Sequence, residues 1–273
     1  MFDRGTRIPN FERCRGLARS SQCGAASGFS GRSIAERRSQ EGNAMITARA
    51  RLVLVALACG TLGRPAASSG DHVWTFDSLD GLKTINGRSE IVTYRGRRAV
   101  HLVAAPDHRS DDNVLAILGD ADFANGTIEA RVAGAPRSDA PPDARGFIGM
   151  AFRVQPDPSR YENLYLRPTN GRADDQLRRN HSVQYASEPD FPWPRLREES
   201  PGKYETYVDL DPGAWTDVKI TVSDRRAQLF VNGATQPCLI VNDLKLGAAH
   251  GRVALWAHWS TDAYFSSAAI HTP

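Results

Sequence analysis

The sequence predicts an all-β fold, a two-sheet antiparallel β-sandwich that occupies residues 71–273. Short runs rich in β-branched and aromatic residues recur along this part of the chain. Clusters of Gly, Pro, Asn and Asp separate them, which is the spacing of a sandwich or barrel. No segment sustains the 3.6-residue apolar period of a helix. About 200 residues are enough to bury one sizeable core.

The chain begins with residues 1–44, which contain eight Arg, no Lys and no sustained apolar pattern. Such a composition buries too little apolar surface to offset the entropy of ordering. Two interpretations remain open. The segment is a disordered extension, or translation starts at Met45 and the start has been called too early.

Residues 45–70 have the layout of a secretory signal. A short basic stretch ends at Arg51, the apolar run 52–58 follows, and small residues continue to Gly70. The apolar run is too short for a membrane span, which needs roughly 20 residues. Cleavage before Cys59 would leave a lipidated cysteine that tethers the domain to a membrane, whereas cleavage after Ser68 would release it. We expect an exported protein that is periplasmic, extracellular or a membrane-anchored lipoprotein.

The basic character of the chain belongs to this leader. The whole chain has a formal net charge of +3, but residues 1–70 hold 11 Arg and only four acidic residues, which leaves −4 for residues 71–273. Charge therefore supplies no argument for nucleic-acid binding, which requires a basic patch on the folded domain. Cys238 is the single cysteine after residue 70, so the domain can form neither an internal disulfide nor a paired-cysteine zinc site.

The strands are expected in order at the β-rich runs 91–94, 99–103, 127–132, 147–154, 163–166, 181–185, 204–208, 215–222, 227–231, 253–258 and 264–270. The turn-forming residues at 95–97 and 223–226 predict hairpins. Segments 82–84 and 243–246 are interpreted as short turns or single helical turns. No internal repeat is present, and the oligomeric state is left open.

Two longer segments interrupt the strand rhythm. Segment 134–144 is a Pro-rich loop, and segment 187–202 is an irregular insertion that contains Trp193. Long loops on a rigid scaffold often carry function. The alternative is a solvent-exposed loop without function, in which Trp193 serves only as a small hydrophobic anchor for the loop.

Alternation along the strands predicts one polar sheet face. Side chains two apart share a face, and the face opposite the core combines planar donors, amides and rings interleaved with Gly149 and Ala151. Sugars suit such a surface, because hydroxyls need polar partners and their C–H faces stack on rings. An ordinary solvent-facing sheet is the alternative. The predicted ligand-binding residues are Arg153, Asn163, Tyr165, Arg167, Gln184, Trp256 and His258 on the sheet, with Trp193 on the overhanging loop.

Chemistry at this face is less well specified by the sequence. A glycosidase needs two carboxyl groups about 5–10 Å apart, and Glu188 and Asp190 near the insertion are candidates, with His181 as a possible base. A polysaccharide lyase would use a His or Tyr base beside an Arg. No cofactor is expected, except that Asp107, Asp111 and Asp112 form an acidic cluster whose oxygens suit a structural Ca²⁺. A plain polar loop is the alternative for this cluster.

Several segments resemble the concanavalin A-like lectin/glucanase superfamily, in particular laminin-G-like and 3-keto-disaccharide hydrolase-like jelly rolls. They are 123–132 (FANGTIEARV), 145–153 (RGFIGMAFR), 215–222 (WTDVKITV), 227–233 (AQLFVNG), 251–256 (GRVALW) and 263–270 (AYFSSAAI).

The resemblance implies two packed antiparallel sheets with a concave face that often binds glycans. The Glu-x-Asp-x-x-Glu strand motif of the family's glucanases is absent from the sequence. The hypothesis is therefore an exported carbohydrate-binding domain, with carbohydrate as partner. A glycoside hydrolase or polysaccharide lyase and a structural or adhesion module are the alternatives.

Overall fold

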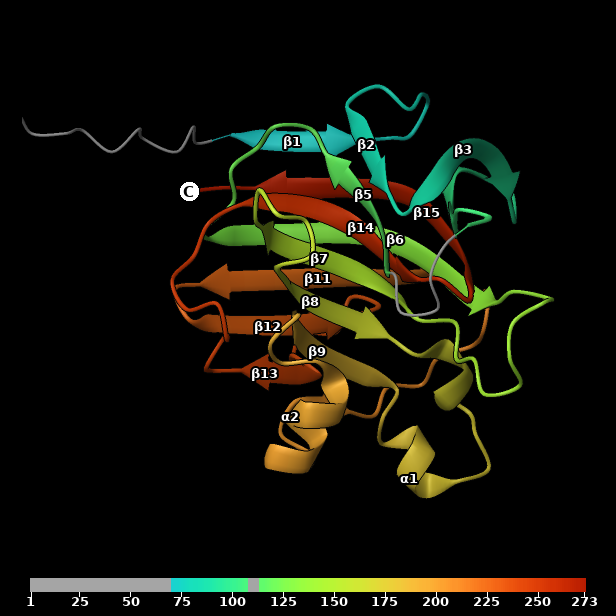
Figure 1. The fold of residues 1–273 in the computed structure, drawn as a ribbon, viewed down its shortest axis with the longest axis vertical. Coiled ribbons are helices and arrows are strands. Elements are labelled where there is room, and N and C mark those ends of the chain that lie inside the picture. The colour runs from blue at the N-terminus through green and yellow to red at the C-terminus, as the bar shows by residue number, and fades with distance from the viewer. Residues whose placement is uncertain (1–69, 108–112) are drawn as a thin grey trace, which may run out of the picture. The chain divides into compact units, whose positions relative to one another are not determined.

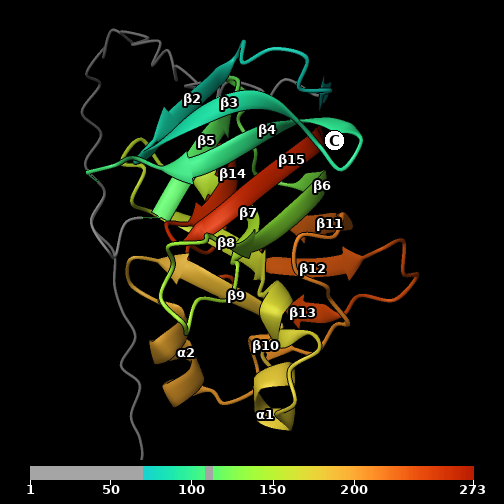
Figure 2. The ribbon, with the colours of Figure 1, turned by 90° about the vertical axis from the view of Figure 1, so that its right-hand side faces the viewer.

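The structure, a computed structural model, describes residues 70–107 and 113–273. Two antiparallel sheets pack face to face, as Figures 1 and 2 show, which confirms the predicted sandwich. The first sheet has the order β13 (Leu239–Val241), β12 (Arg226–Val231), β11 (Thr216–Ser223), β6 (Gly126–Pro136), β15 (Thr261–His271), β4 (Arg97–Ala104) and β3 (Gly87–Tyr94), with β1 (Asp71–Trp74) paired to β15. The second has the order β10 (Glu205–Thr206), β9 (Val183–Glu188), β8 (Tyr161–Leu166), β7 (Ile148–Val154), β14 (Arg252–His258), β5 (Asn113–Leu118) and β2 (Leu82–Ile85).

Short helical turns lie at the lower end of the second sheet in Figure 1. They are η1 (Pro168–Asn170), α1 (Gln176–Arg179) and α2 (Trp193–Glu199). None of the helices in the described ranges has the length and apolar content to cross a bilayer. The predicted leader segments, including Cys59, and the loop residues Asp111 and Asp112 lie outside the described residues.

The main core lies between the sheets and follows the predicted alternation. Ile148, Met150 and Phe152 of β7 point into it, as do Leu164 and Leu166 of β8. Along β11 every second residue is buried, so the intervening side chains face away from the partner sheet. Burial of these apolar side chains holds the two sheets together.

Both predicted hairpins are confirmed. Arg95 (φ 44°) and Gly96 (φ 75°) form the two-residue link between β3 and β4, and two positive φ values are what a type I′ turn requires. The hairpin between β11 and β12 turns at Asp224 (φ 53°).

Several elements differ from the sequence-based expectation. Segment 82–84 was expected to be a turn but forms β2, which pairs with β5 along four residues. Strands β1, β5 and β13 were not predicted. Segment 187–202, expected to be irregular, contains α2, which begins after Pro192. The short strands β1, β2 and β13 carry too few residues for a two-residue period to stand out, and the nearly continuous apolar run of β5 shows no alternation.

Candidate ligand-binding site

Side chains from five strands form one row across the outer face of the second sheet, which is the face turned away from the first sheet. Strand register places Gln184, Tyr165, Gly149, Trp256 and Leu115 side by side. The Tyr165 and Trp256 rings lie 4.8 Å apart, centroid to centroid. They flank Gly149, where an added Cβ would come within 2.2 Å of the Leu164 carbonyl oxygen. Only glycine therefore permits this close packing.

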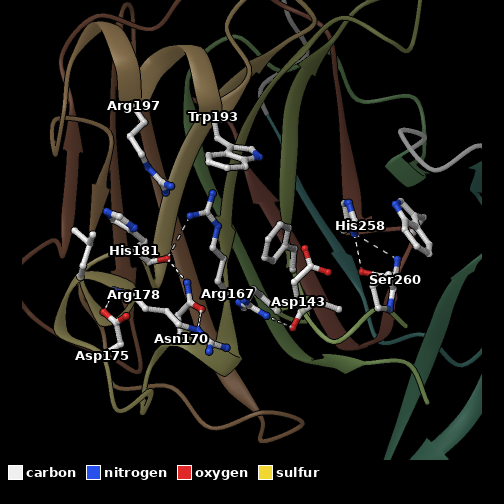
Figure 3. A pocket seen from close by; sticks show the side chains of 16 residues that line it. Asp143, Arg167, Asn170, Asp175, Arg178, His181, Trp193, Arg197, His258 and Ser260 are labelled. Atoms are coloured by element: carbon white, nitrogen blue, oxygen red, sulfur yellow. Dashed lines mark hydrogen bonds between the residues drawn. The ribbon is translucent and has the colours of Figure 1, made fainter. Parts of the chain in front are cut away.

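A pocket of about 620 Å³ opens beside this row, where β8 ends and β7 begins (Figure 3). Ligand pockets typically measure roughly 300–1,000 Å³. Arg167 follows β8, Phe147 precedes β7 and His258 ends β14, so the sheet forms one wall. The remaining lining residues belong to loops and short helices, and they are Pro141, Asp143, Ala144, Arg145, Asn170, Asp175, Leu177, Arg178, His181, Trp193, Arg197, Trp259 and Ser260. Segments 134–144 and 187–202, which the sequence singled out, both border the pocket.

Arg167 is the central side chain of the pocket. It is 3% exposed, and its guanidinium carbon lies 5.0–5.3 Å from the ring centroids of Phe147, Tyr165 and Trp193. One terminal nitrogen donates to the Tyr165 hydroxyl at 3.0 Å and to Gln184 Oε1 at 3.1 Å. The Nε–H is buried without a hydrogen-bond partner. A guanidinium held by rings in this way is pre-positioned toward the pocket.

The carboxylate of Glu205 faces three basic side chains. Arg197 Nη2 lies 2.6 Å from one of its oxygens, and His181 Nε2 lies 3.2 Å from the other. Arg167 is farther away at 3.9 Å. Burial lowers the pKa of His181. The Glu205 and Asp175 carboxylates oppose this shift, whereas Arg197 and Arg167 add to it. His181 is therefore held toward its neutral form.

Two further arginines enter the pocket from the side opposite α2. Arg178 Nε donates to Asn170 Oδ1 at 3.0 Å. Arg145 Nη1 donates to the carbonyl of Ala144 at 3.0 Å. Burial lowers the pKa of Arg145, and the neighbouring charges of Arg178 and Arg167 lower it further, against the opposing effect of Asp143. Positive charge is therefore concentrated at this end of the sheet.

The prediction that Arg153 lies on the outer face is wrong. Its side chain is 1% exposed and donates four hydrogen bonds to the backbone carbonyls of Ala124, Gly247 and Asp224. A β-bulge is the cause, because Arg153 has φ 53° and the register between β7 and β14 shifts at this point. The extra residue interrupts the alternation, so Arg153 leaves the outer face and Val154 joins it.

Asn163 and Gln184 lie on the outer face as predicted, but in different circumstances. Gln184 donates to two backbone carbonyls and accepts from Arg167, so its amide is fully engaged. Asn163 sits between Ala151 and Ala186 in the adjacent row, and both of its amide atoms are buried without a partner. Trp193 and His258 line the pocket, whereas Trp256 packs against Tyr165 behind it.

The candidate catalytic residues His181 and Glu188 lie in different pockets. Glu188 ends β9 and lines a separate pocket with Tyr161, where burial raises the pKa of its carboxyl. His181 precedes the same strand by two residues, so about seven residues of extended chain, roughly 20 Å, separate the two. Asp190 forms an exposed ion pair with Arg160 at 2.6 Å.

Of the three aspartates in the predicted calcium cluster, the structure describes Asp107, which is exposed. Among residues 70–107 and 113–273, no group of three His, Cys, Asp or Glu side chains is placed to hold a metal ion.

Arg145, Asn170, Arg178 and Arg197 were not predicted as site residues. They lie in loops and short helices, where neither alternation nor a motif specifies direction. The sequence pointed to this region only through segments 134–144 and 187–202, the two long loops that interrupt the strands.

Comparisons with known proteins identify the fold. No family model matches the chain, and no curated protein matches it. A solved protein of unknown function with a galectin-like fold from Bacillus subtilis is 11% identical, covers 73% of this chain and 94% of its own, and has a TM-score of 0.50. Lower scores are found for carbohydrate-binding module CBM66 from the same organism (16% identity, 68% and 91%, TM-score 0.45) and for peanut lectin (9%, 75% and 97%, 0.46). The domain therefore has a two-sheet antiparallel β-sandwich fold of the jelly-roll kind, similar to the galectin-like fold of that protein.

Proposed function

We propose that this protein is an exported carbohydrate-binding protein whose ligand occupies the pocket between β8, α1 and α2. The observation that carries the proposal is Arg167, which is held among three aromatic rings at the pocket wall. Rings can stack on the C–H face of a sugar, and a planar guanidinium can bond two adjacent oxygens.

The surrounding residues support the same ligand class. Trp193, Phe147 and Trp259 supply aromatic surface to the pocket lining, and His181, Asn170 and Ser260 supply polar atoms. Mixed lining of this kind is typical of small-ligand sites. Export rests on the signal-like layout of residues 45–70.

A glycan-array screen of the full chain, followed by titration calorimetry on the hits, tests the proposal. Trp193→Ala should weaken binding about tenfold or more, since an aromatic anchor in a pocket often contributes that much. Tyr207→Ala is the matched control. Tyr207 is 39% exposed, carries a similar stacked arginine (Arg179) and lies outside the pocket, so its loss should leave affinity unchanged.

Thermal melts of both variants establish that each is folded. A wild-type chain that binds no glycan would refute the proposed function. Full affinity in a folded Trp193→Ala variant would remove the ligand from this pocket.

A further inference from the structure

The pocket holds more positive charge than its own carboxylates neutralise. Four arginines line it, namely Arg145, Arg167, Arg178 and Arg197. We propose, on the basis of the carbohydrate-binding function above, that the ligand is an acidic sugar whose carboxylate or sulfate group sits between Arg167, Arg178 and Arg145.

Glu205 does not balance this charge, because its carboxylate is already engaged. It receives a two-pronged contact from Arg197, whose Nε lies 3.1 Å from Oε1 and whose Nη2 lies 2.6 Å from Oε2, and a third contact from His181. Arg167 remains at 3.9 Å, too long for a hydrogen bond. The buried Glu205 carboxylate therefore pairs mainly with Arg197 rather than with Arg167.

Arg178 and Arg145 have neutral partners. The Arg178 guanidinium donates to an amide oxygen and that of Arg145 to backbone carbonyls, and neither forms an ion pair with a carboxylate in the described ranges. The two lining aspartates, Asp143 and Asp175, are exposed at the rim. Asp175 uses one oxygen to accept the backbone N–H of Arg178 at the start of α1.

Arg167 also has a donor that no protein group uses. Its side chain is 4% exposed and its Nε–H lacks a partner, and a buried donor left unbonded is costly. In Figure 3, Arg167 lies between Trp193 and Arg197 on one side and Asn170 and Arg178 on the other. An anionic group bound there would accept charge-assisted hydrogen bonds, which are the strongest that a guanidinium forms.

The excess of positive charge at the pocket does not follow from the composition of the domain. Residues 71–273 carry a formal net charge of −4, so a general basic composition does not explain four arginines from four separate elements. Mutual repulsion among them lowers the pKa of Arg145 in addition to the effect of burial. A bound anion would relieve that repulsion, whereas a neutral sugar would not.

The test is a binding comparison between charged glycans and their neutralised counterparts, using the full chain. The probes are polygalacturonate and alginate oligomers with their carboxyl-reduced forms, and chondroitin sulfate and dextran sulfate with their desulfated forms. The acidic member of at least one pair should bind about tenfold or more tightly, the scale of one charge-assisted hydrogen bond. Preference for uronates identifies a carboxylate as the bound group, and preference for sulfated chains identifies a sulfate.

Two variants locate the anion. Arg178→Gln should reduce affinity for the acidic probe about tenfold more than it reduces affinity for the neutral counterpart. Arg172→Gln is the control, because Arg172 is exposed, lies outside the pocket and already pairs with Asp209 and Asp211. Equal or tighter binding of the neutral forms would overturn this inference and leave carbohydrate binding standing. Absence of binding to every charged and neutral probe would overturn both.

Discussion

At the scale of single residues, Glu162 shows how burial sets protonation in this sandwich. Its side chain is fully buried between the sheets, where Oε2 accepts a hydrogen bond from the Tyr185 hydroxyl and Oε1 accepts the Leu246 N–H at 2.7 Å. Burial raises the pKa of Glu162 above its ordinary 4.5. The two hydrogen bonds and the charge of Arg153 oppose that shift without cancelling it.

The free energy of unfolding should therefore fall as pH rises above about 4.5. Below that value the carboxyl is protonated in both the folded and the unfolded chain. Above it the unfolded chain releases its proton first, which stabilises the unfolded state until the raised pKa of the folded state is passed. Glu162→Gln should reduce this decline in urea unfolding measured between pH 4 and 8.

Glu198→Gln, on the exposed face of α2, serves as the control and should keep the wild-type slope. Glu188, whose pKa burial also raises, contributes the same background in all three proteins. Equal slopes for wild type and Glu162→Gln would show that Glu162 is not the source of the pH dependence.

Residue-scale prediction from sequence succeeded where alternation is regular. Asn163, Tyr165 and Trp256 lie on the expected face because β8 and β14 are regular where these residues sit. Arg153 failed because a single left-handed residue in β7 moved its side chain to the other side. A bulge has no sequence signature at an arginine, since non-glycine residues rarely adopt positive φ.

At the scale of elements, α2 is a short helix that depends on one side chain. It spans the seven residues Trp193–Glu199, follows Pro192 without a side-chain cap, and buries Leu196 in the main core. A helix of this length is not stable alone in water. Packing of Leu196 therefore positions Trp193 and Arg197 at the pocket.

Leu196→Ala should loosen α2 and weaken ligand binding. Loss of a buried leucine side chain costs about 2–5 kcal/mol, and Leu196 is the residue of α2 that is buried. Hydrogen exchange should accelerate in peptides that cover 193–200, whereas β8 and β14 keep their protection. Leu177→Ala on α1, where Leu177 is 67% exposed, should change neither stability nor exchange. Unaltered exchange in α2 would contradict this dependence.

At the scale of elements, prediction from sequence was least successful where the alternation of the strands stops. The insertion at 187–202 was recognised as a candidate functional loop because it breaks the rhythm, but its helix was not predicted. Two prolines near Trp193 favour a turn in the sequence, and the tertiary contact of Leu196 decides the outcome. Arg178 on α1, Arg197 on α2 and Arg145, which follows segment 134–144, come together only when the chain folds.

At the scale of the whole molecule, the last strand in the sequence is central in the first sheet. β15 lies between β6 and β4, pairs with β6 along its whole length, and also carries β1. Contacts between such distant segments are slow to form, so refolding on a time scale of roughly milliseconds to seconds is expected. The first sheet cannot close until the C-terminal residues are available, which is compatible with the proposed export of an unfolded chain.

A chain that ends at Ser260 should therefore fail to fold cooperatively. It loses the pairing partner of β6, β4 and β1 together, along with the buried Phe265 and Ile270, and it exposes two unpaired strand edges inside the sheet. Deletion of 71–74 is the matched control, because β1 pairs only with β15. That deletion should lower the urea midpoint while preserving a single transition. Near-ultraviolet circular dichroism and urea titration distinguish the two. A cooperative transition in the chain ending at Ser260 would mean that β15 is an accessory to the sheet rather than its centre.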